Sequence, residues 1–196
     1  MKIIDAHLHL FPENKAWAEE MARNVGHHNS AEHLRQAYRE LGIVHGVVMG
    51  NHSLKTGEQP GPEDLFHYCV GLDSSLMDDS GRPLPDLAEQ VEEHLRRERC
   101  CGIKLYPGYN RIALTDPIYE PLYALAAQYK KPVAVHMGLT AHPRAYLKYC
   151  HPLALDEAAA DHPDTHFVMC HFGNPFLEAA AAVVEKNPNV SADLSG

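Results

Sequence analysis

Residues 3–9 of the chain read I-I-D-A-H-L-H, a short apolar segment that ends in two histidines one residue apart. Because side chains alternate between the two faces of a β-strand, a strand here would place His7 and His9 side by side, as two ligands of one metal ion require. Asp5 would lie on the same face. The pair alone is a weak signal, since 15 histidines in 196 residues give about one H-x-H by chance. Its place at the end of the first apolar segment makes it informative.

Length and composition favour a soluble globular protein with small-molecule partners. A chain of 196 residues can bury one core, so a single domain over residues 1–196 is expected. The 26 acidic and 17 basic side chains argue against a nucleic-acid partner or a membrane surface. No apolar run resembles a signal peptide or a membrane span. The five cysteines are odd in number, include an adjacent pair and lie mostly in or beside apolar segments, which indicates reduced thiols in a cytoplasmic protein. The absence of C-x-x-C argues against a thiolate zinc site.

Apolar, β-branched segments alternate with helical patterns along the chain. Strands are expected at residues 3–9, 43–49, 66–72, 101–106, 132–136, 166–171 and 190–194. Helices are expected at residues 12–24, 31–42, 84–99, 115–129, 152–161 and 176–186, and a loop at residues 51–63. Pro117 is expected at the first position of its helix, and Asn174-Pro175 is expected to cap the last helix.

Strands that alternate with helices pair in parallel, with the helices outside the sheet. An open dinucleotide-binding sheet would require a glycine-rich turn after the first strand, but residues 7–12 read H-L-H-L-F-P. Polar side chains gather at the ends of the predicted strands: His7, His9, Lys104, Tyr106, His136, His171 and Asp193. In a barrel these ends meet at one mouth, which is the usual place of an active site. We therefore expect an α/β fold, a TIM-like (β/α) barrel of parallel strands with outer helices.

Five short motifs carry a resemblance to a known family. They are I-D-A-H-L-H at 4–9, G-I-K-L-Y-P at 102–107, V-H-M-G at 135–138, C-H-F-G at 170–173 and N-V-S-A-D-L-S-G at 189–196. In this order they resemble the amidohydrolase superfamily, within it the amidohydrolase-related branch that includes aminocarboxymuconate-semialdehyde decarboxylase. The resemblance implies that zinc or another divalent ion binds at the barrel mouth. It implies that His7, His9 and His136 are metal ligands and that His171 is a metal-adjacent or catalytic residue.

The residue types agree with this chemistry independently of the family. Three neutral imidazoles with an open position describe a catalytic zinc site, where the pKa of a bound water falls toward about 7. His171, if it is not a ligand, could move the proton. Lys104 and Tyr106 share one strand face and are expected to look into the mouth. Lys104 either holds a substrate carboxylate, which we favour, or is carboxylated to bridge two metals, as in binuclear relatives.

The chain departs from the family pattern at its end. Family barrels have eight strands, and the eighth ends in an aspartate that binds the metal or acts as a base, whereas this chain stops at Gly196 after the seventh predicted strand. Asp5 and Asp193 are expected in supporting roles around the ligands. Three explanations are open: a chain truncated at its C-terminus, which we favour, a barrel completed in a homo-oligomer, or a fold with an open seam.

Three functions compete at this stage. The first is a metal-dependent hydrolase that acts on a small carboxylated or cyclic substrate through a metal-activated water. The second is a metal-dependent decarboxylase of the same branch, in which carbon dioxide leaves from the same mouth. The third is a catalytically inactive or incomplete metal-binding protein, which the absent eighth-strand aspartate suggests. The sequence does not separate the first two.

Overall fold

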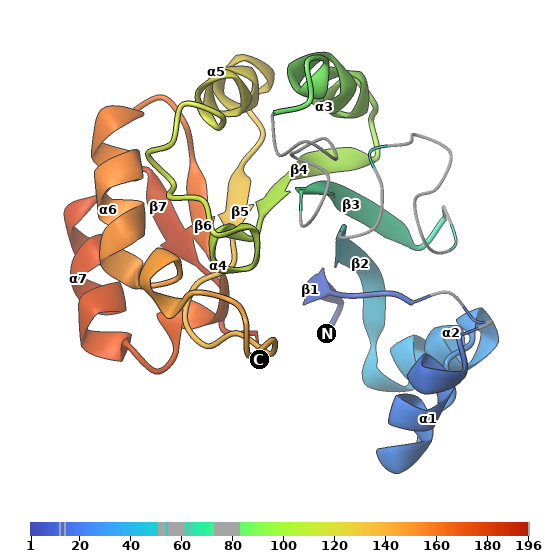
Figure 1. The fold of residues 1–196 in the computed structure, drawn as a ribbon. Coiled ribbons are helices and arrows are strands. Elements are labelled where there is room, and N and C mark those ends of the chain that lie inside the picture. The colour runs from blue at the N-terminus through green and yellow to red at the C-terminus, as the bar shows by residue number, and fades with distance from the viewer. Residues whose placement is uncertain are drawn as a thin grey trace.

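The fold is one curled sheet of parallel strands with helices outside it (Figure 1). The computed structural model describes residues 1–11, 13, 15–50, 54, 62, 64–72 and 83–195. The strands are β1 (Ile3–Leu8), β2 (Ile43–Met49), β3 (Phe66–Leu72), β4 (Cys100–Leu105), β5 (Val133–Val135), β6 (Phe167–Met169) and β7 (Val190–Ala192). They lie in the sheet in sequence order. This arrangement confirms the predicted TIM-like barrel, of which the described residues contribute seven strands and no eighth.

The helices are α1 (Ala16–Asn24), α2 (Ala31–Leu41), α3 (Leu87–Leu95), α4 (Pro107–Asn110), α5 (Glu120–Tyr129), α6 (Pro152–Asp161) and α7 (Leu177–Lys186), with the 3₁₀ turns η1 (Leu147–Tyr149) and η2 (Cys170–Gly173). Helices α3, α5, α6 and α7 lie along the outer side of the sheet, whereas α1 projects away from it (Figure 1). The loop predicted at residues 51–63 and the helix start predicted at Pro12 lie almost entirely outside the described residues.

Helix α2 shows why the sequence pattern predicted most of these elements well. The Ser30 side chain accepts a hydrogen bond from the backbone N–H of His33 at 3.2 Å and so caps the first turn. At the other end Gly42 adopts a left-handed conformation, with φ 72°, which a residue without a Cβ adopts at little cost. Because both ends carry a capping signal, the observed helix agrees with the prediction to within a residue.

One predicted helix start and one predicted helix cap are wrong. Helix α5 begins at Glu120 rather than at residue 115, because the Asp116 side chain accepts the N–H of Ile118 at 3.0 Å and closes a turn before the helix. Helix α7 begins at Leu177, and Phe176, rather than Asn174, is its N-terminal flanking residue. At α5 a local turn replaces the first helical turn that the proline had suggested, whereas α7 begins within one residue of its predicted start.

The sixth strand is shorter than predicted, and this changes the setting of His171. Strand β6 ends at Met169, so Cys170 and His171 lie in the following turn η2. His171 has φ 60° and Phe172 has φ 45°, a left-handed conformation that costs a non-glycine residue about 1–2 kcal/mol. Such strain persists only where surrounding contacts impose it, so the contacts of this turn must hold its conformation.

The core lies between the sheet and the outer helices. Phe66, Ile103, Leu122 and Phe167 are among the fully buried side chains that fill this layer. His94 on α3 is also fully buried, with one ring nitrogen 2.9 Å from the Tyr68 hydroxyl and the other 2.8 Å from the Leu54 carbonyl oxygen. Its polar atoms are thus satisfied within the core.

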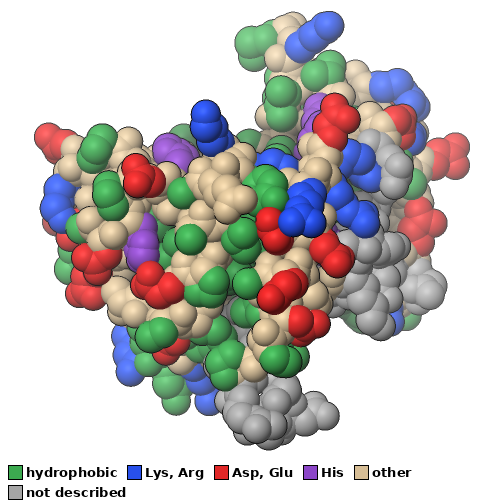
Figure 2. Space-filling model, turned by 90° about the horizontal axis from the view of Figure 1, so that it is seen from above, with side chains coloured by type: hydrophobic (Ala, Val, Ile, Leu, Met, Phe, Trp, Pro, Cys, Tyr) green, Lys and Arg blue, Asp and Glu red, His purple; other side chains and the backbone are tan. Residues whose placement is uncertain are grey.

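The surface carries side chains of both charges. Figure 2 shows acidic and basic side chains interspersed on the face seen from above, with apolar side chains between them. Among the helices of the described residues, none combines the length and the apolar character needed to cross a bilayer.

Candidate metal centre

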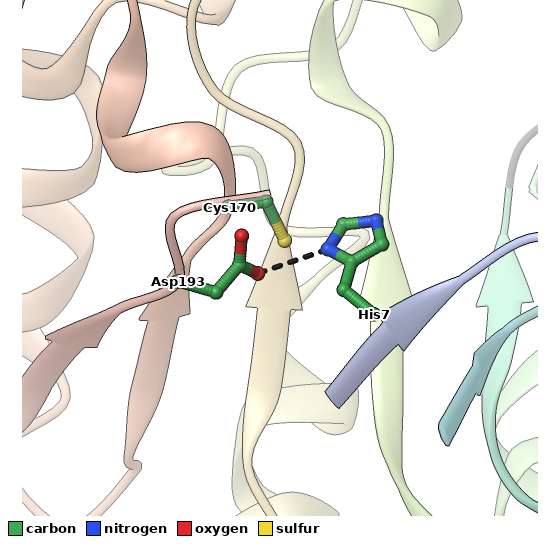
Figure 3. Close-up of side chains that lie close together, drawn as sticks. All are labelled: His7, Cys170 and Asp193. Carbon is green, nitrogen blue, oxygen red and sulfur yellow. Dashed lines mark hydrogen bonds and ion pairs between the residues drawn. The ribbon is translucent and has the colours of Figure 1, made fainter. Parts of the chain in front are cut away.

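His7 lies at the end of β1 with one ring nitrogen engaged and the other without a partner. Its Nδ1 is 2.9 Å from Oδ2 of Asp193, which follows β7 (Figure 3). Because a carboxylate only accepts, Nδ1 carries the hydrogen and Nε2 carries a lone pair. This Nε2 is buried and has no hydrogen-bond partner among the described residues. A buried lone pair without a donor is unusual, and a metal ion would satisfy it.

His136 and His171 face each other across the mouth with two further lone pairs. Nδ1 of His136 lies 3.2 Å from Nε2 of His171. The opposite nitrogen of His136 donates to the Leu139 carbonyl at 2.9 Å, and that of His171 donates to the Ser195 carbonyl at 2.9 Å. Both facing nitrogens are therefore acceptors, so their contact is unfavourable unless a cation lies between them.

The spacing of this pair suits a metal ion. Zinc–nitrogen bonds of about 2.0–2.1 Å at tetrahedral angles separate two ligand nitrogens by about 3.3 Å. Burial, and then the charge of Lys104, lowers the pKa of His136 to about 3, and burial also lowers the pKa of His171. Both rings are thus neutral, as metal ligands must be, and each is oriented by a hydrogen bond from its other nitrogen.

His9 occupies a more open position than the other three histidines. It directly follows the last residue of β1, is exposed, and its ring centroid lies 5.4 Å from that of His7. The rings of His7 and His171 are 5.0 Å apart, and those of His171 and His136 are 4.7 Å apart. Successive ring contacts therefore link the four histidines, and His9 is the exposed one among them.

Asp193 orients two of the histidines. In addition to its bond with the His7 ring, its Oδ1 accepts the backbone N–H of His171 at 2.9 Å and a hydrogen bond from the Ser195 hydroxyl. The bond to the backbone of His171 helps to hold its left-handed conformation. Although burial opposes it, hydrogen bonding by His7, Ser195 and His171 lowers the pKa of Asp193 far below its usual range. Asp193 therefore stays ionised and links the end of β7 to β1.

Asp5 acts on the main chain rather than on a ring. Its Oδ1 accepts the backbone N–H of His7 at 3.2 Å, and its Oδ2 accepts the hydroxyl of Tyr38 at 3.0 Å. The carboxylate therefore joins β1 to α2 and steadies the backbone that carries His7.

Lys104 and Tyr106 lie on the mouth side of β4, but deep within it. The Lys104 side chain is fully buried, and its Nζ lies 5.2 Å from the centre of the Tyr106 ring. The Tyr106 hydroxyl donates to the Gly50 carbonyl at 3.0 Å. The ammonium donates to the sulfur of Cys170 at 2.9 Å. Substrate binding by this pair stays a prediction.

Cys170 is the site residue that sequence reasoning missed. Its sulfur, His7 and Asp193 offer ligand atoms within 4.8 Å of one another (Figure 3). Burial raises the pKa of the Cys170 thiol to about 11, so the thiol is neutral at pH 7. Its position directly before His171, within the C-H-F-G motif, was the signal that could have pointed to it.

The chain is similar in fold to several solved structures. A TIM-barrel protein from Bordetella bronchiseptica is 20% identical, with a TM-score of 0.71 over 100% of this chain and 75% of that one. A zinc-bound amidohydrolase from Burkholderia multivorans is 16% identical, with a TM-score of 0.65 over 100% and 70%. A probable 2-pyrone-4,6-dicarboxylic acid hydrolase from Acinetobacter baumannii, with citric acid bound, is 17% identical, with a TM-score of 0.59 over 100% and 71%.

Comparison with sequences gives the family. No curated protein matches the chain. A sequence model of the amidohydrolase family matches residues 77–196, which is more than half of the chain and includes the segments that carry Lys104, His136, His171 and Asp193. Because this match agrees with the barrel fold, the chain belongs to the amidohydrolase family.

Proposed function

We propose that this protein is a metal-dependent hydrolase that acts on a small carboxylated or cyclic substrate. The observation that carries the proposal is the set of three imidazole lone pairs at the mouth, on His7, His136 and His171. Each of these rings donates its other N–H to an oxygen, which is the usual arrangement around a metal-binding histidine.

A divalent ion, most simply zinc, would be held by His7, His136 and His171, with exposed His9 beside them as a further ligand. When bound, it would act as a Lewis acid toward water and a substrate carbonyl. Asp193 keeps the His7 ring in the tautomer that presents Nε2 to the ion. The buried ammonium of Lys104 makes the mouth favourable for negative charge that develops on a substrate oxygen.

A basic pocket beside the mouth supports a carboxylated substrate. Its volume is about 310 Å³, and it is lined by Tyr109, Arg111, His142, Arg144 and Ala145. The Tyr109 ring contacts the His136 ring edge to face, with centroids 5.1 Å apart, so the pocket adjoins the proposed ligands. Guanidinium groups bind carboxylates through paired hydrogen bonds. The dicarboxylic acid in the name of the Acinetobacter baumannii protein, and its bound citric acid, support the same substrate class.

The test is hydrolysis of a panel of small lactones and amides, each with and without a carboxylate, by zinc-loaded and chelator-treated protein. We expect zinc-dependent hydrolysis that the His7→Ala/His136→Ala variant lacks. Arg144→Ala should raise KM for carboxylated substrates and leave neutral ones unchanged, whereas Arg35→Ala on α2, which pairs with Asp64, should change neither.

Other outcomes would select the competing functions. Release of carbon dioxide from carboxylated compounds without hydrolysis would replace the proposal with a decarboxylase. Stoichiometric zinc binding with no turnover of either kind would replace it with a metal-binding protein.

A further inference from the structure

Two cysteine sulfurs lie next to each other on neighbouring strands of the sheet. The Sγ atoms of Cys69 on β3 and Cys101 on β4 are 3.8 Å apart, and both thiols are free. Cys101 is the second residue of β4, whereas Lys104 and Tyr106 of the mouth lie near or after the carboxyl end of this strand. The proposed hydrolysis uses neither thiol.

An irregularity in the strand pairing brings the two cysteines onto one face of the sheet. Tyr68 pairs with Cys100, but Cys69 pairs with Gly102, so Cys101 is an extra residue that forms a β-bulge in β4. Cys100 belongs to the main core between the sheet and the helices, whereas Cys101 packs against the separate small cluster that contains Cys69. The adjacent cysteines of β4 thus face opposite sides of the sheet, and Cys101 is the one that meets Cys69.

Hydrogen bonding makes the two thiols chemically different. Sγ of Cys101 lies 3.4 Å from the carbonyl oxygen of Tyr68, which can only accept. The Cys101 thiol therefore donates to this carbonyl, and the Cys69 thiol donates to the Cys101 sulfur. This bond from Cys69 lowers the pKa of the Cys101 thiol and raises the pKa of the Cys69 thiol well above its ordinary value. The thiolate consequently forms first on Cys101.

Exposure to solvent separates the two thiols in the same sense. Cys101 is partly exposed, whereas Cys69 is only 3% exposed. An accessible thiol with a lowered pKa beside a second thiol is typical of cysteines that react with oxidants and then close a disulfide. A small oxidant would therefore meet the sulfur of Cys101 before that of Cys69.

The spacing of the strands is compatible with a disulfide. Neighbouring strands lie about 4.8 Å apart, and disulfides join residues whose Cα atoms are about 4.4–6.8 Å apart. Because an S–S bond is about 2.05 Å long, each sulfur must move by about 0.9 Å, which rotation about the Cα–Cβ bonds can supply. A Cβ on Gly102 would lie 3.2 Å from the Cys69 sulfur, so the glycine leaves room for this sulfur.

We propose that Cys69 and Cys101 form a reversible disulfide when the protein meets hydrogen peroxide. The Cys101 thiolate attacks one peroxide oxygen, so that an S–O bond forms, the O–O bond breaks, and the leaving hydroxide takes a proton to become water. The Cys69 sulfur then attacks the sulfenic sulfur of Cys101. An S–S bond forms, the S–O bond breaks, and the Cys69 proton leaves with the hydroxide as a second water. Each sulfur loses one electron, and the peroxide gains two.

The disulfide would join β3 to β4 in the middle of the sheet. Two cysteines that are free at rest and close on oxidation are typical of redox-sensing sites. The inference goes beyond the proposed hydrolysis and does not depend on it.

The test treats the reduced full chain, free of added metal, with hydrogen peroxide and counts the remaining thiols with a chromogenic reagent in denaturant. The wild type should lose two of its five thiols and regain both with dithiothreitol. The matched control Cys100→Ala removes the neighbouring thiol on the opposite face and should also lose two thiols. Mass spectrometry of its unreduced tryptic digest should show the peptides of Cys69 and Cys101 joined, and Cys101 is then the only cysteine between Arg99 and Lys104.

Two further variants separate the steps of the reaction. Cys69→Ala should stop at the sulfenic acid of Cys101, which dimedone traps. Cys101→Ala should form no link and should react roughly tenfold more slowly, because it lacks the thiol that ionises first.

Three outcomes would overturn the proposal: no joined peptide in oxidised Cys100→Ala, a joined peptide that contains other cysteines instead, or oxidation of Cys101 to the sulfinic acid without a link. All of these measurements are independent of whether the mouth binds zinc or the protein hydrolyses anything.

Discussion

At the scale of single residues, Asp193 joins the parts of the mouth that come from opposite ends of the chain. It accepts the ring hydrogen of His7 and the backbone N–H of His171. Asp193→Asn keeps the size of the side chain but removes its charge and weakens its hold on the His7 tautomer. We expect zinc affinity at the mouth to fall about 10–100-fold, measured by chelator competition. Asp156→Asn, whose carboxylate binds Lys186 on the surface, is the control. Unchanged affinity in Asp193→Asn would contradict the role of Asp193.

His94 gives a prediction about pH. Burial lowers the pKa of His94, so below its unfolded value of about 6.5 the unfolded chain binds the proton more readily than the folded one. The contribution of neutral His94 to the free energy of unfolding is therefore fully present above about pH 6.5. It is lost as the pH falls toward the lower pKa of the folded state. One such group changes the free energy of unfolding by at most about 1.4 kcal/mol per pH unit.

Urea denaturation at about pH 7.5 and about pH 5.5, on either side of the unfolded pKa, measures this effect. We expect His94→Gln to be less stable at the higher pH, because two buried hydrogen bonds are altered, but to lose less stability than the wild type at the lower pH. His142→Gln, at an exposed position, should keep the wild-type dependence. The same loss in His94→Gln as in the wild type would assign the pH dependence to other groups.

At the scale of elements, the sequence predicted what periodicity and capping determine. Strands β2 and β3 and helix α6 lie where their apolar patterns placed them, because a buried strand or an amphipathic helix is encoded by its own residues. The start of α5 and the end of β6 were wrong, because a side-chain turn at Asp116 and contacts from Asp193 to η2 decide them. The second of these is a contact between residues 22 positions apart, which local pattern does not report.

Gly138, in the loop after β5, affects the site through the conformation of this loop. This residue has φ 85°, and a Cβ placed on it would collide with the Asn174 carbonyl oxygen. Neighbouring Leu139 supplies the carbonyl that orients the His136 ring. Gly138→Ala should therefore lower both thermal stability and zinc affinity, although it removes no ligand.

Gly26→Ala is the matched control, since Gly26 has φ 80° but no atom within 4 Å of the place that a Cβ would occupy. It should cost only the conformational penalty of about 1 kcal/mol and should leave the mouth unaffected. Thermal melting and chelator titration of the two variants distinguish the conformational penalty of a positive φ from the collision of the new Cβ with the Asn174 carbonyl. Equal losses in both variants would mean that the contact with Asn174 is relieved by the loop without consequence for His136.

At the scale of the whole molecule, the mouth is assembled from residues that lie near opposite ends of the chain. The sequence could place His7, His136, His171 and Asp193 at one end of a barrel, because parallel strands bring their carboxyl ends together. It could not show that His171 faces His136, or that the sulfur of Cys170 accepts from Lys104, because those contacts depend on the curl of the sheet and on the turn after β6. The order of the family motifs in the sequence predicted the residues of the site. Their hydrogen bonds became visible only in the three-dimensional fold.

A metal ion at the mouth should therefore stabilise the molecule as a whole. His7 is carried by β1, while His136 and His171 follow β5 and β6, so one ion would connect the first strand to the far end of the sheet. At a free zinc concentration about 100-fold above Kd, linkage predicts about 2.7 kcal/mol of added stability. For a chain of this size that corresponds to a rise in Tm of roughly 5–11 °C.

The measurement is the Tm of the full chain with and without saturating zinc. The His7→Ala/His136→Ala variant should show no rise in Tm, because the remaining His171 nitrogen cannot hold the ion alone. Calcium, which prefers oxygen ligands, should not replace zinc. Hydrogen exchange should slow most in β1, since that strand is at one edge of the sheet and gains a second connection to the far end beside the His7–Asp193 bond. A Tm that saturating zinc leaves unchanged would mean that the facing lone pairs of His136 and His171 do not form a metal site.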